Sequence, residues 1–203
     1  MRICVLCNTS QQNEILEKKI SETHRLDFIQ STDELKYYDN ADIFFLLSEE
    51  IGEFKTTKPV FYNNVILPHR AAKKPGNFHR INGWPTFLKR DVWEVSSENI
   101  DEVDRSLGEL GFKYLQTEDT PGFVAARVIS MIINEAYFAF EENVSSKADI
   151  NTAMKLGTNY PFGPFEWAEM IGLDKIYSLL TKLELTDNRY KPSKALIAEA
   201  INQ

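Results

Sequence analysis

The first 51 residues of the chain contain no glycine, and the first glycine is Gly52. Glycine lets a backbone approach a phosphate group closely, because it has no β-carbon that would intervene. A glycine-rich phosphate-binding turn is therefore excluded from the beginning of this sequence.

Cysteine is also scarce. Cys4 and Cys7 both lie in the apolar run RICVLC at 2–7, and the chain has no other cysteine. A zinc site would need two further ligands close to such a C-x-x-C pair. A redox-active pair of this spacing begins a helix and does not lie within a strand. We therefore expect two reduced cysteines in the core and no metal site.

Long apolar runs and basic stripes are missing as well. No run approaches the length of a transmembrane helix, and the first residues, MRICVLCNTS, lack the features of a signal peptide. The net charge is −7, and no basic stripe offers a surface to nucleic acid. We therefore expect a cytoplasmic protein that binds neither membranes nor nucleic acids. A hydrophobic share of 43% indicates a folded, globular chain.

Up to about residue 118, runs typical of strands alternate with runs typical of helices. Strands that are apolar on both faces and alternate with helices are typical of a parallel sheet covered by helices. Residues 1–118 are therefore predicted to form an α/β domain. The predicted strands are 2–7, 25–30, 41–48, 59–66, 77–82, 91–97 and 113–118, and the predicted helices are 12–20, 31–38 and 98–111.

From residue 119 onward the pattern is helical throughout. Pro121 suits the first position of a long helix that runs to about residue 143, and the apolar residues of this helix fall on nearly all sides. Residues 119–203 are therefore predicted to form an all-α domain in which the long helix is buried. Capping residues and glycines delimit further helices that begin near Ser146, Pro164, Asp174 and Ser193.

Three segments of the second domain carry a family resemblance: DTPGFVAAR (119–127), DINTAMKLGTNYPFGPFEWAEMIGLD (149–174) and KPS (191–193). In this order they resemble the C-terminal domain of the 3-hydroxyacyl-CoA dehydrogenases. The resemblance implies a Rossmann-like sheet domain followed by a helical domain like the C-terminal domain of 6-phosphogluconate dehydrogenase. It also implies an oxidoreductase of fatty acid metabolism with NAD as cofactor, an acyl-CoA as substrate, and a homodimer formed through the helical domain.

The resemblance extends more weakly into the first domain. The family has a catalytic His in an H-x-x-N pattern and a Glu in a later strand, and His79, Asn82 and Glu94 match them. Oxidising a secondary alcohol requires a base for the hydroxyl proton and a hydride acceptor, and a carboxylate on the second imidazole nitrogen fixes the tautomer of that base. The resemblance therefore implies His79 as base, Glu94 as its partner and Asn82 as a substrate contact. Taken alone, His79 is equally consistent with a structural histidine at a strand end.

The sequence departs from the family at several places. The glycines of the G-x-G-x-x-G turn, expected within VLCNTSQQNEI, are all absent. The family's catalytic Ser aligns with Val65 and an Asn of the long helix aligns with Ala126, and neither side chain can hydrogen-bond a substrate. The first domain is short for the family. The interval from His79 to Glu94 is longer than in the family, with the additional residues in the segment 83–91.

We favour the hypothesis of a pseudoenzyme, a 3-hydroxyacyl-CoA dehydrogenase-like protein with impaired or lost NAD-dependent activity that binds an acyl-CoA, CoA or a partner protein. The losses fall on the cofactor and catalytic loops, whereas the helical half keeps its pattern. The alternative is an active NAD-dependent 3-hydroxyacyl-CoA (3-hydroxybutyryl-CoA) dehydrogenase with His79 as base and Glu94 as its partner. A third hypothesis is a different reaction at a remodelled cleft. Measuring NAD binding separates the first two.

Overall fold

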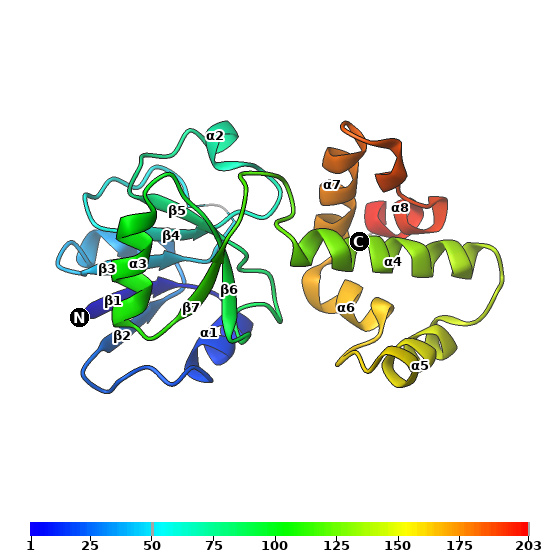
Figure 1. The fold of residues 1–203 in the computed structure, drawn as a ribbon, viewed down its shortest axis with the longest axis horizontal. Coiled ribbons are helices and arrows are strands. Elements are labelled where there is room, and N and C mark those ends of the chain that lie inside the picture. The colour runs from blue at the N-terminus through cyan, green and yellow to red at the C-terminus, as the bar shows by residue number, and fades with distance from the viewer. Residues whose placement is uncertain (50, 203) are drawn as a thin grey trace. The chain divides into compact units, whose positions relative to one another are not determined.

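The computed structural model describes residues 1–49 and 51–202 and divides the chain into two compact units, Met1–Phe123 and Val124–Gln203 (Figure 1). We call them the sheet unit and the helical unit. The predicted fold class, a reduced Rossmann-like α/β domain followed by an all-α domain, is confirmed. Among the described helices, none is both long and apolar enough to span a lipid bilayer.

The sheet unit contains one seven-stranded sheet with the order β2-β1-β3-β4-β5-β6-β7. β1 lies between β2 and β3, so the strand order reverses at β1 as it does in doubly wound folds. The strands are β1 (Arg2–Leu6), β2 (Arg25–Ile29), β3 (Ile43–Leu46), β4 (Val60–Asn63), β5 (Phe78–Ile81), β6 (Val92–Ser96) and β7 (Lys113–Gln116).

The predicted parallel arrangement holds from β2 to β5, and the β5–β6 pair is antiparallel. The segment 82–91 between these two strands contains turns and no helix. A parallel connection needs a crossover that returns the chain to the other end of the sheet, whereas antiparallel neighbours need only a loop. β7 pairs in parallel with β6, so the last two strands run against the first five.

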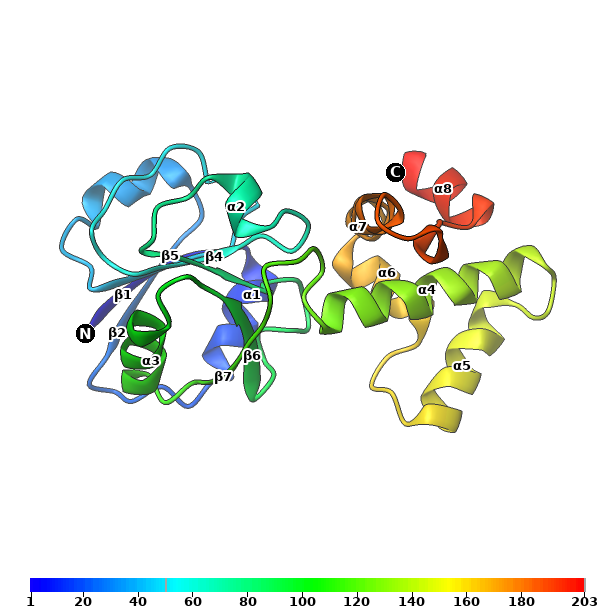
Figure 2. The ribbon, with the colours of Figure 1, turned by 45° about the horizontal axis from the view of Figure 1, so that its top comes forward.

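Helices cover both faces of the sheet (Figure 2). α1 (Thr9–Leu16) and α3 (Ile100–Glu109) lie on one face, and the 3-10 helix η1 (Thr32–Tyr37) and the short α2 (His69–Ala72) lie on the other. Each face carries its own apolar cluster, because successive residues of a strand point to opposite sides. The sheet is therefore the middle layer of three, and its strand ends position the side chains described below.

Both cysteines are buried, free thiols, Cys4 in the cluster beneath η1 and Cys7 in the cluster beneath α1. Burial raises the pKa of Cys4 to about 12 and the pKa of Cys7 to about 11. Both thiols therefore stay protonated near neutral pH, as befits core side chains. Within the described residues, no group of three or more His, Cys, Asp or Glu side chains is placed to hold a metal ion.

The helical unit is organised around α4, with α5 and α6 on one side of it and α7 and α8 on the other (Figure 1). All the helices predicted after residue 119 are present, but α4 begins at Ala125 and not at Pro121. The backbone delays the helix, because Gly122 and Phe123 have positive φ angles of 86° and 49°. The helices are α4 (Ala125–Glu141), α5 (Lys147–Thr158), α6 (Pro164–Ile171), α7 (Leu173–Glu184), the 3-10 helix η2 (Asn188–Tyr190) and α8 (Lys194–Ile201).

The boundary between the units lies after Phe123 and not after residue 118, because residues 119–123 pack on the sheet unit. The N–H of Gly122 donates to the carbonyl of Val65 at 2.8 Å. The guanidinium of Arg80 lies over the ring of Phe123, 4.2 Å from the ring centre. The DTPGF segment, which the resemblance assigned to the helical domain, is thus structurally part of the sheet unit.

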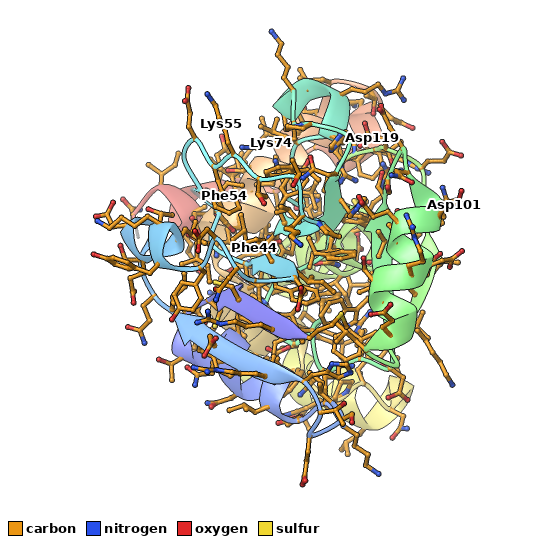
Figure 3. The ribbon with its side chains drawn as sticks, turned by 90° about the vertical axis from the view of Figure 1, so that its left-hand side faces the viewer. Phe44, Phe54, Lys55, Lys74, Asp101 and Asp119 are labelled. Carbon is orange, nitrogen blue, oxygen red and sulfur yellow. The ribbon has the colours of Figure 1, made fainter. Side chains whose placement is uncertain are left out.

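An ion pair between Arg80 and Asp119 holds this segment. Figure 3 labels Asp119. Arg80 is fully buried on β5, donates to the carbonyl of Thr120 at 2.6 Å and lies 3.4 Å from the Asp119 carboxylate. Asp119 also accepts the N–H groups of His69 at 2.6 Å and Arg70 at 3.1 Å, at the start of α2. Partial burial alone would raise the pKa of Asp119, but these N–H donors and Arg80 lower it. The carboxylate therefore joins three separate segments of the sheet unit.

Replacing Asp119 tests the importance of this pair. Asp119→Ala leaves a buried guanidinium without its carboxylate and two N–H groups of α2 without their acceptor, so the free energy of unfolding should fall by about 3 kcal/mol. The matched control is Arg25→Ala, which removes an exposed ion pair with Asp27 and should cost at most about 1 kcal/mol. Urea unfolding followed by circular dichroism measures both. Equal losses in the two variants would contradict the role assigned to Asp119.

Candidate active site

His79 lies on β5, and its side chain is fully buried. Its Nδ1 is 2.8 Å from Oγ of Ser97, which follows β6, and its Nε2 is 3.0 Å from a carboxylate oxygen of Glu102 in the first turn of α3. The imidazole also packs against the ring of Phe61, with 5.0 Å between the ring centres. Both ring nitrogens thus bond to residues that were not predicted from the sequence.

The Glu102 carboxylate fixes the proton positions of the neutral imidazole. An ionised carboxylate only accepts hydrogen bonds, so Nε2 carries the proton and Nδ1 presents its lone pair to the Ser97 hydroxyl. Ser97 Oγ in turn accepts the N–H of Asn99 at 2.9 Å, which leaves the hydroxyl proton for His79. Burial lowers the pKa of His79, and the nearby Glu102 carboxylate opposes this effect only in part. The neutral imidazole therefore predominates near neutral pH.

Asn82 and Glu94 lie on the opposite face of the sheet from His79. β5 and β6 pair Ile81 with Val95, so Asn82 stands across from Glu94, and Asn82 Nδ2 donates to the Glu94 carboxylate at 3.0 Å. Because alternate residues of a strand point to opposite faces, His79 shares a face with Ile81 while Glu94 points away from it. The expected contact between His79 and Glu94 is therefore wrong, and the sheet brings Glu94 to Asn82 instead.

The carboxyl ends of β1 and β3 form the edge at which doubly wound sheets bind dinucleotides, since the strand order reverses there. In this chain the side-chain amide of Gln11, from the first turn of α1, donates to the carbonyls of Leu47 and Gly83, each at 3.0 Å. Asn63 accepts the N–H of Gly83 at 2.9 Å and donates to the carbonyl of Leu47 at 3.2 Å. Gln11 and Asn63 are each only 4% exposed. The protein's own polar groups therefore close this edge.

The beginning of α1 is capped from within the chain. Asn8 accepts the N–H of Gln11 at 2.9 Å, and the Gln11 side chain accepts the N–H of Asn8 at 3.1 Å, which is a complete capping box. In a dinucleotide-binding turn, N–H groups at this position face the pyrophosphate. At the same edge, Gly83 lies so close to Asn63 that a β-carbon would come within 2.9 Å of it. The absence of a side chain at Gly83 therefore lets the loop after β5 pack closely against Asn63 of β4.

Gln30 follows β2, where dinucleotide-binding folds place an acidic residue for the ribose hydroxyls. Glu34, the acidic residue close by, accepts the N–H groups of Gln30 at 3.2 Å and Ser31 at 3.1 Å and so completes the cap of η1. The residues present at this edge do not fit NAD, because neither the pyrophosphate nor the ribose meets the groups that normally hold it.

Glu14 holds the loop that follows β5 against α1. Its buried carboxylate accepts three main-chain N–H groups, from Thr86 at 2.6 Å, Leu88 at 3.1 Å and Lys89 at 3.2 Å. Thr86 has a positive φ of 76°, a strained conformation that this concave array of N–H groups requires. The indole N–H of Trp93 donates to the carbonyl of Leu88 at 2.8 Å. The interval from His79 to Glu94 therefore contains an ordered loop, which bonds to Glu14 on one side and to Trp93 on the other.

Val65 and Ala126, which the resemblance aligns with a Ser and an Asn of the family, are both buried, Val65 in the sheet unit and Ala126 in α4. An apolar side chain offers a substrate no hydrogen bond. Both positions therefore lack the polar group that the resemblance associates with the reaction.

Gln11, Glu14, Ser97 and Glu102 were not predicted from the sequence. A local signal for Gln11 existed, since N-x-x-Q ahead of a helix is a capping-box pattern. Its bonds to Leu47 and Gly83, and the contacts of Glu14, Ser97 and Glu102, join residues far apart in the chain. No local pattern indicates such contacts.

The Ser97 side of the His79 cluster borders a cavity of about 510 Å³. This volume lies within the range of small-molecule sites. The walls are mostly polar and include His69, Arg70, Ser96, Ser97, Gln116 and Thr117. A second cavity, of about 390 Å³, lies beside Asn63, Asn64 and Lys74 near the ends of β3 and β4. Ser97 therefore meets a cavity other than the closed edge at β1 and β3.

Comparison with known proteins matches residues 122–200 to the family described as "3-hydroxyacyl-CoA dehydrogenase, C-terminal domain". The mitochondrial hydroxyacyl-coenzyme A dehydrogenase of Sus scrofa is 38% identical over 209 residues, which cover 93% of this chain and 67% of that protein. The mitochondrial enzyme of Homo sapiens is 46% identical over 184 residues, covering 82% of this chain and 59% of that protein. The 3-hydroxyadipyl-CoA dehydrogenase of Escherichia coli is 41% identical over 113 residues, covering 53% and 24%.

Solved structures show the same fold over nearly the whole chain. The crystal structure of (S)-3-hydroxybutyryl-CoA dehydrogenase from Ralstonia eutropha has a TM-score of 0.69 at 20% identity, covering 99% of this chain and 93% of that one. FadB2 of M. tuberculosis has a TM-score of 0.72 at 13% identity, with the same coverage of 99% and 93%. In sequence, the chain spans between 24% and 67% of the lengths of the curated relatives named above. The match over residues 122–200 and the relative from Sus scrofa together show that the chain belongs to the 3-hydroxyacyl-CoA dehydrogenase family.

Proposed function

We propose that the NAD-dependent reaction of the family is impaired or lost in this protein, and that the protein acts as an acyl-CoA-binding protein or as a dimeric interaction protein. The observation that carries the proposal is the closed edge at β1 and β3, where Gln11 bridges the carbonyls of Leu47 and Gly83. A dinucleotide bound there would have to break these buried hydrogen bonds, and each buried group left unpaired costs about 1–3 kcal/mol.

The arrangement of the family-matched residues supports the same proposal. His79 bonds to Ser97 and Glu102 on one face of the sheet, while Asn82 and Glu94 bond to each other on the other face. A base, its carboxylate partner and a substrate contact have to converge on one reacting group for acid–base catalysis. The three residues implied by the resemblance do not converge in this way.

The helical unit supports the homodimer. None of the residues of α5, all of which the structure describes, is buried, and Leu156 on this helix is 83% exposed. A helix of this length is marginal in water unless tertiary packing covers an apolar face. On α4, Val128 is 49% exposed, so the expectation of a long helix buried on all sides is not met within one chain. A second copy packed on the helical unit would cover such surface.

An active dehydrogenase is the alternative. The names of the relatives favour it, since all three curated relatives named above are described as dehydrogenases of hydroxyacyl-CoA substrates. The alternative requires NAD to bind although the edge at β1 and β3 is closed. Cofactor binding therefore separates the two functions.

NADH titration should give no binding. We expect neither a change in NADH fluorescence nor calorimetric heat up to about 1 mM, the upper end of usual enzyme KM values, because Gln11 closes the edge at β1 and β3. The Sus scrofa relative, measured in parallel, is the positive control. Micromolar NADH binding together with turnover of acetoacetyl-CoA would overturn the proposal in favour of the alternative.

The homodimer is tested by light scattering after gel filtration. The expected mass is twice the chain mass of 23.4 kDa. Leu156→Glu places a charge on the exposed face of α5 and should shift the protein toward the mass of one chain, because a buried unpaired charge opposes association. The matched control is Leu16→Glu, at a 56% exposed leucine in the sheet unit, which should leave the mass unchanged. A monomeric wild-type protein would refute the dimer.

A further inference from the structure

Ser97, His79 and Glu102 form a linear array that the family resemblance does not account for. Ser97 Oγ lies 2.8 Å from Nδ1 of His79, and Nε2 of the same ring lies 3.0 Å from Glu102. A hydroxyl within hydrogen-bond reach of an imidazole, with that imidazole oriented by a carboxylate, is the arrangement that activates a serine nucleophile. Such an arrangement is recognised by its geometry and not by the order of its residues in the chain.

We propose that Ser97 is a nucleophile, with His79 as its general base and Glu102 as the carboxylate that orients the base, and that this site transfers a short acyl group from an activated ester or thioester to water. The proposed reaction uses no NAD. It therefore goes beyond the proposed function and stands independently of it.

The proton positions suit this chemistry. Because Glu102 accepts the proton on Nε2, Nδ1 is left as the acceptor for the Ser97 hydroxyl. The N–H of Asn99 donates to Ser97 Oγ at 2.9 Å, which fixes the oxygen and leaves its own proton directed at Nδ1. Burial lowers the pKa of His79, so the imidazole is neutral and able to accept a proton near neutral pH.

The acyl transfer balances with water as the second reactant. In the first step Ser97 Oγ attacks the acyl carbon and its proton moves to His79 Nδ1. The bond from carbon to the leaving oxygen or sulfur breaks, and the leaving group takes the proton from Nδ1 as an alcohol or a thiol. In the second step water attacks the ester on Ser97 and gives its proton to Nδ1. The carboxylic acid departs, and Ser97 recovers its proton from Nδ1.

The cavity of about 510 Å³ beside Ser97 supplies the place for the acyl group. Its polar walls favour a short acyl chain over a long apolar one. Arg70 and Gln116, both in the cavity lining, carry N–H donors of the type that stabilise a developing oxyanion. His79 has no exposed surface and is absent from the cavity lining, so Ser97 is the member of the array that meets the cavity.

The test uses a fluorophosphonate, which reacts with activated serines, on the full chain. We expect one label per chain, located at Ser97 by peptide mass spectrometry and absent from Ser97→Ala. Glu102→Gln should slow the labelling at least about tenfold, because an amide that donates to Nε2 imposes the wrong tautomer on His79. Ser21→Ala is the control, since Ser21 is an exposed serine outside the cavity lining and should leave the rate unchanged.

Substrate turnover separates the two acyl sources. p-Nitrophenyl acetate tests oxygen esters and acetyl-CoA tests thioesters, and hydrolysis of at least one of them should disappear in Ser97→Ala. The peptide map of the labelled wild-type protein decides the question even if a variant fails to fold. No label, a label at another serine, or hydrolysis of both substrates that survives in a folded Ser97→Ala variant overturns the proposal.

Discussion

The pairing of β5 with β6 is the constraint on which the rest of the sheet unit depends. Because the two strands are antiparallel and pair Ile81 with Val95, Asn82 faces Glu94 while His79 points to the other side. Side chains on opposite faces of a sheet cannot share a substrate without a change of register. His79 consequently bonds to Ser97 and Glu102, the arrangement on which the proposed acyl transfer rests.

The loop after β5 connects this register to the edge at β1 and β3. Glu14 binds three of the loop's N–H groups, and Gln11, one helical turn earlier, bonds to Gly83 at the start of the same loop. Both side chains come from α1, the helix whose N-terminus would hold the pyrophosphate in a dinucleotide-binding fold. Asn8 and Gln11 stand where a dinucleotide-binding fold has its glycine-rich turn, and the side chain of Gln11 occupies the edge at β1 and β3.

Much of the fold could be predicted from the sequence, because strand and helix periods are local signals. The alternating apolar runs gave the sheet, and capping residues gave the helices of the helical unit. The antiparallel β5–β6 pair, the short α2 and the place of residues 119–123 could not be predicted, since they depend on contacts such as that of Arg80 with Asp119. The site was predicted only in part. The H-x-x-N pattern indicated His79 and Asn82. Their hydrogen-bond partners depend on the register of the strands, which the sequence alone does not specify.

The central claim is that His79 is a buried, neutral imidazole shared by Ser97 and Glu102. Long-range proton–nitrogen NMR spectra recorded across a pH titration test it most directly. Glu102 of α3 and Ser97 face the ring, and His69 of α2 is a further titratable group that acts on it. Burial lowers the pKa of His79, so we expect the Nε2–H tautomer and a titration midpoint below the ordinary value of 6.5. A midpoint above 6.5, or a proton on Nδ1 in the neutral ring, would contradict it.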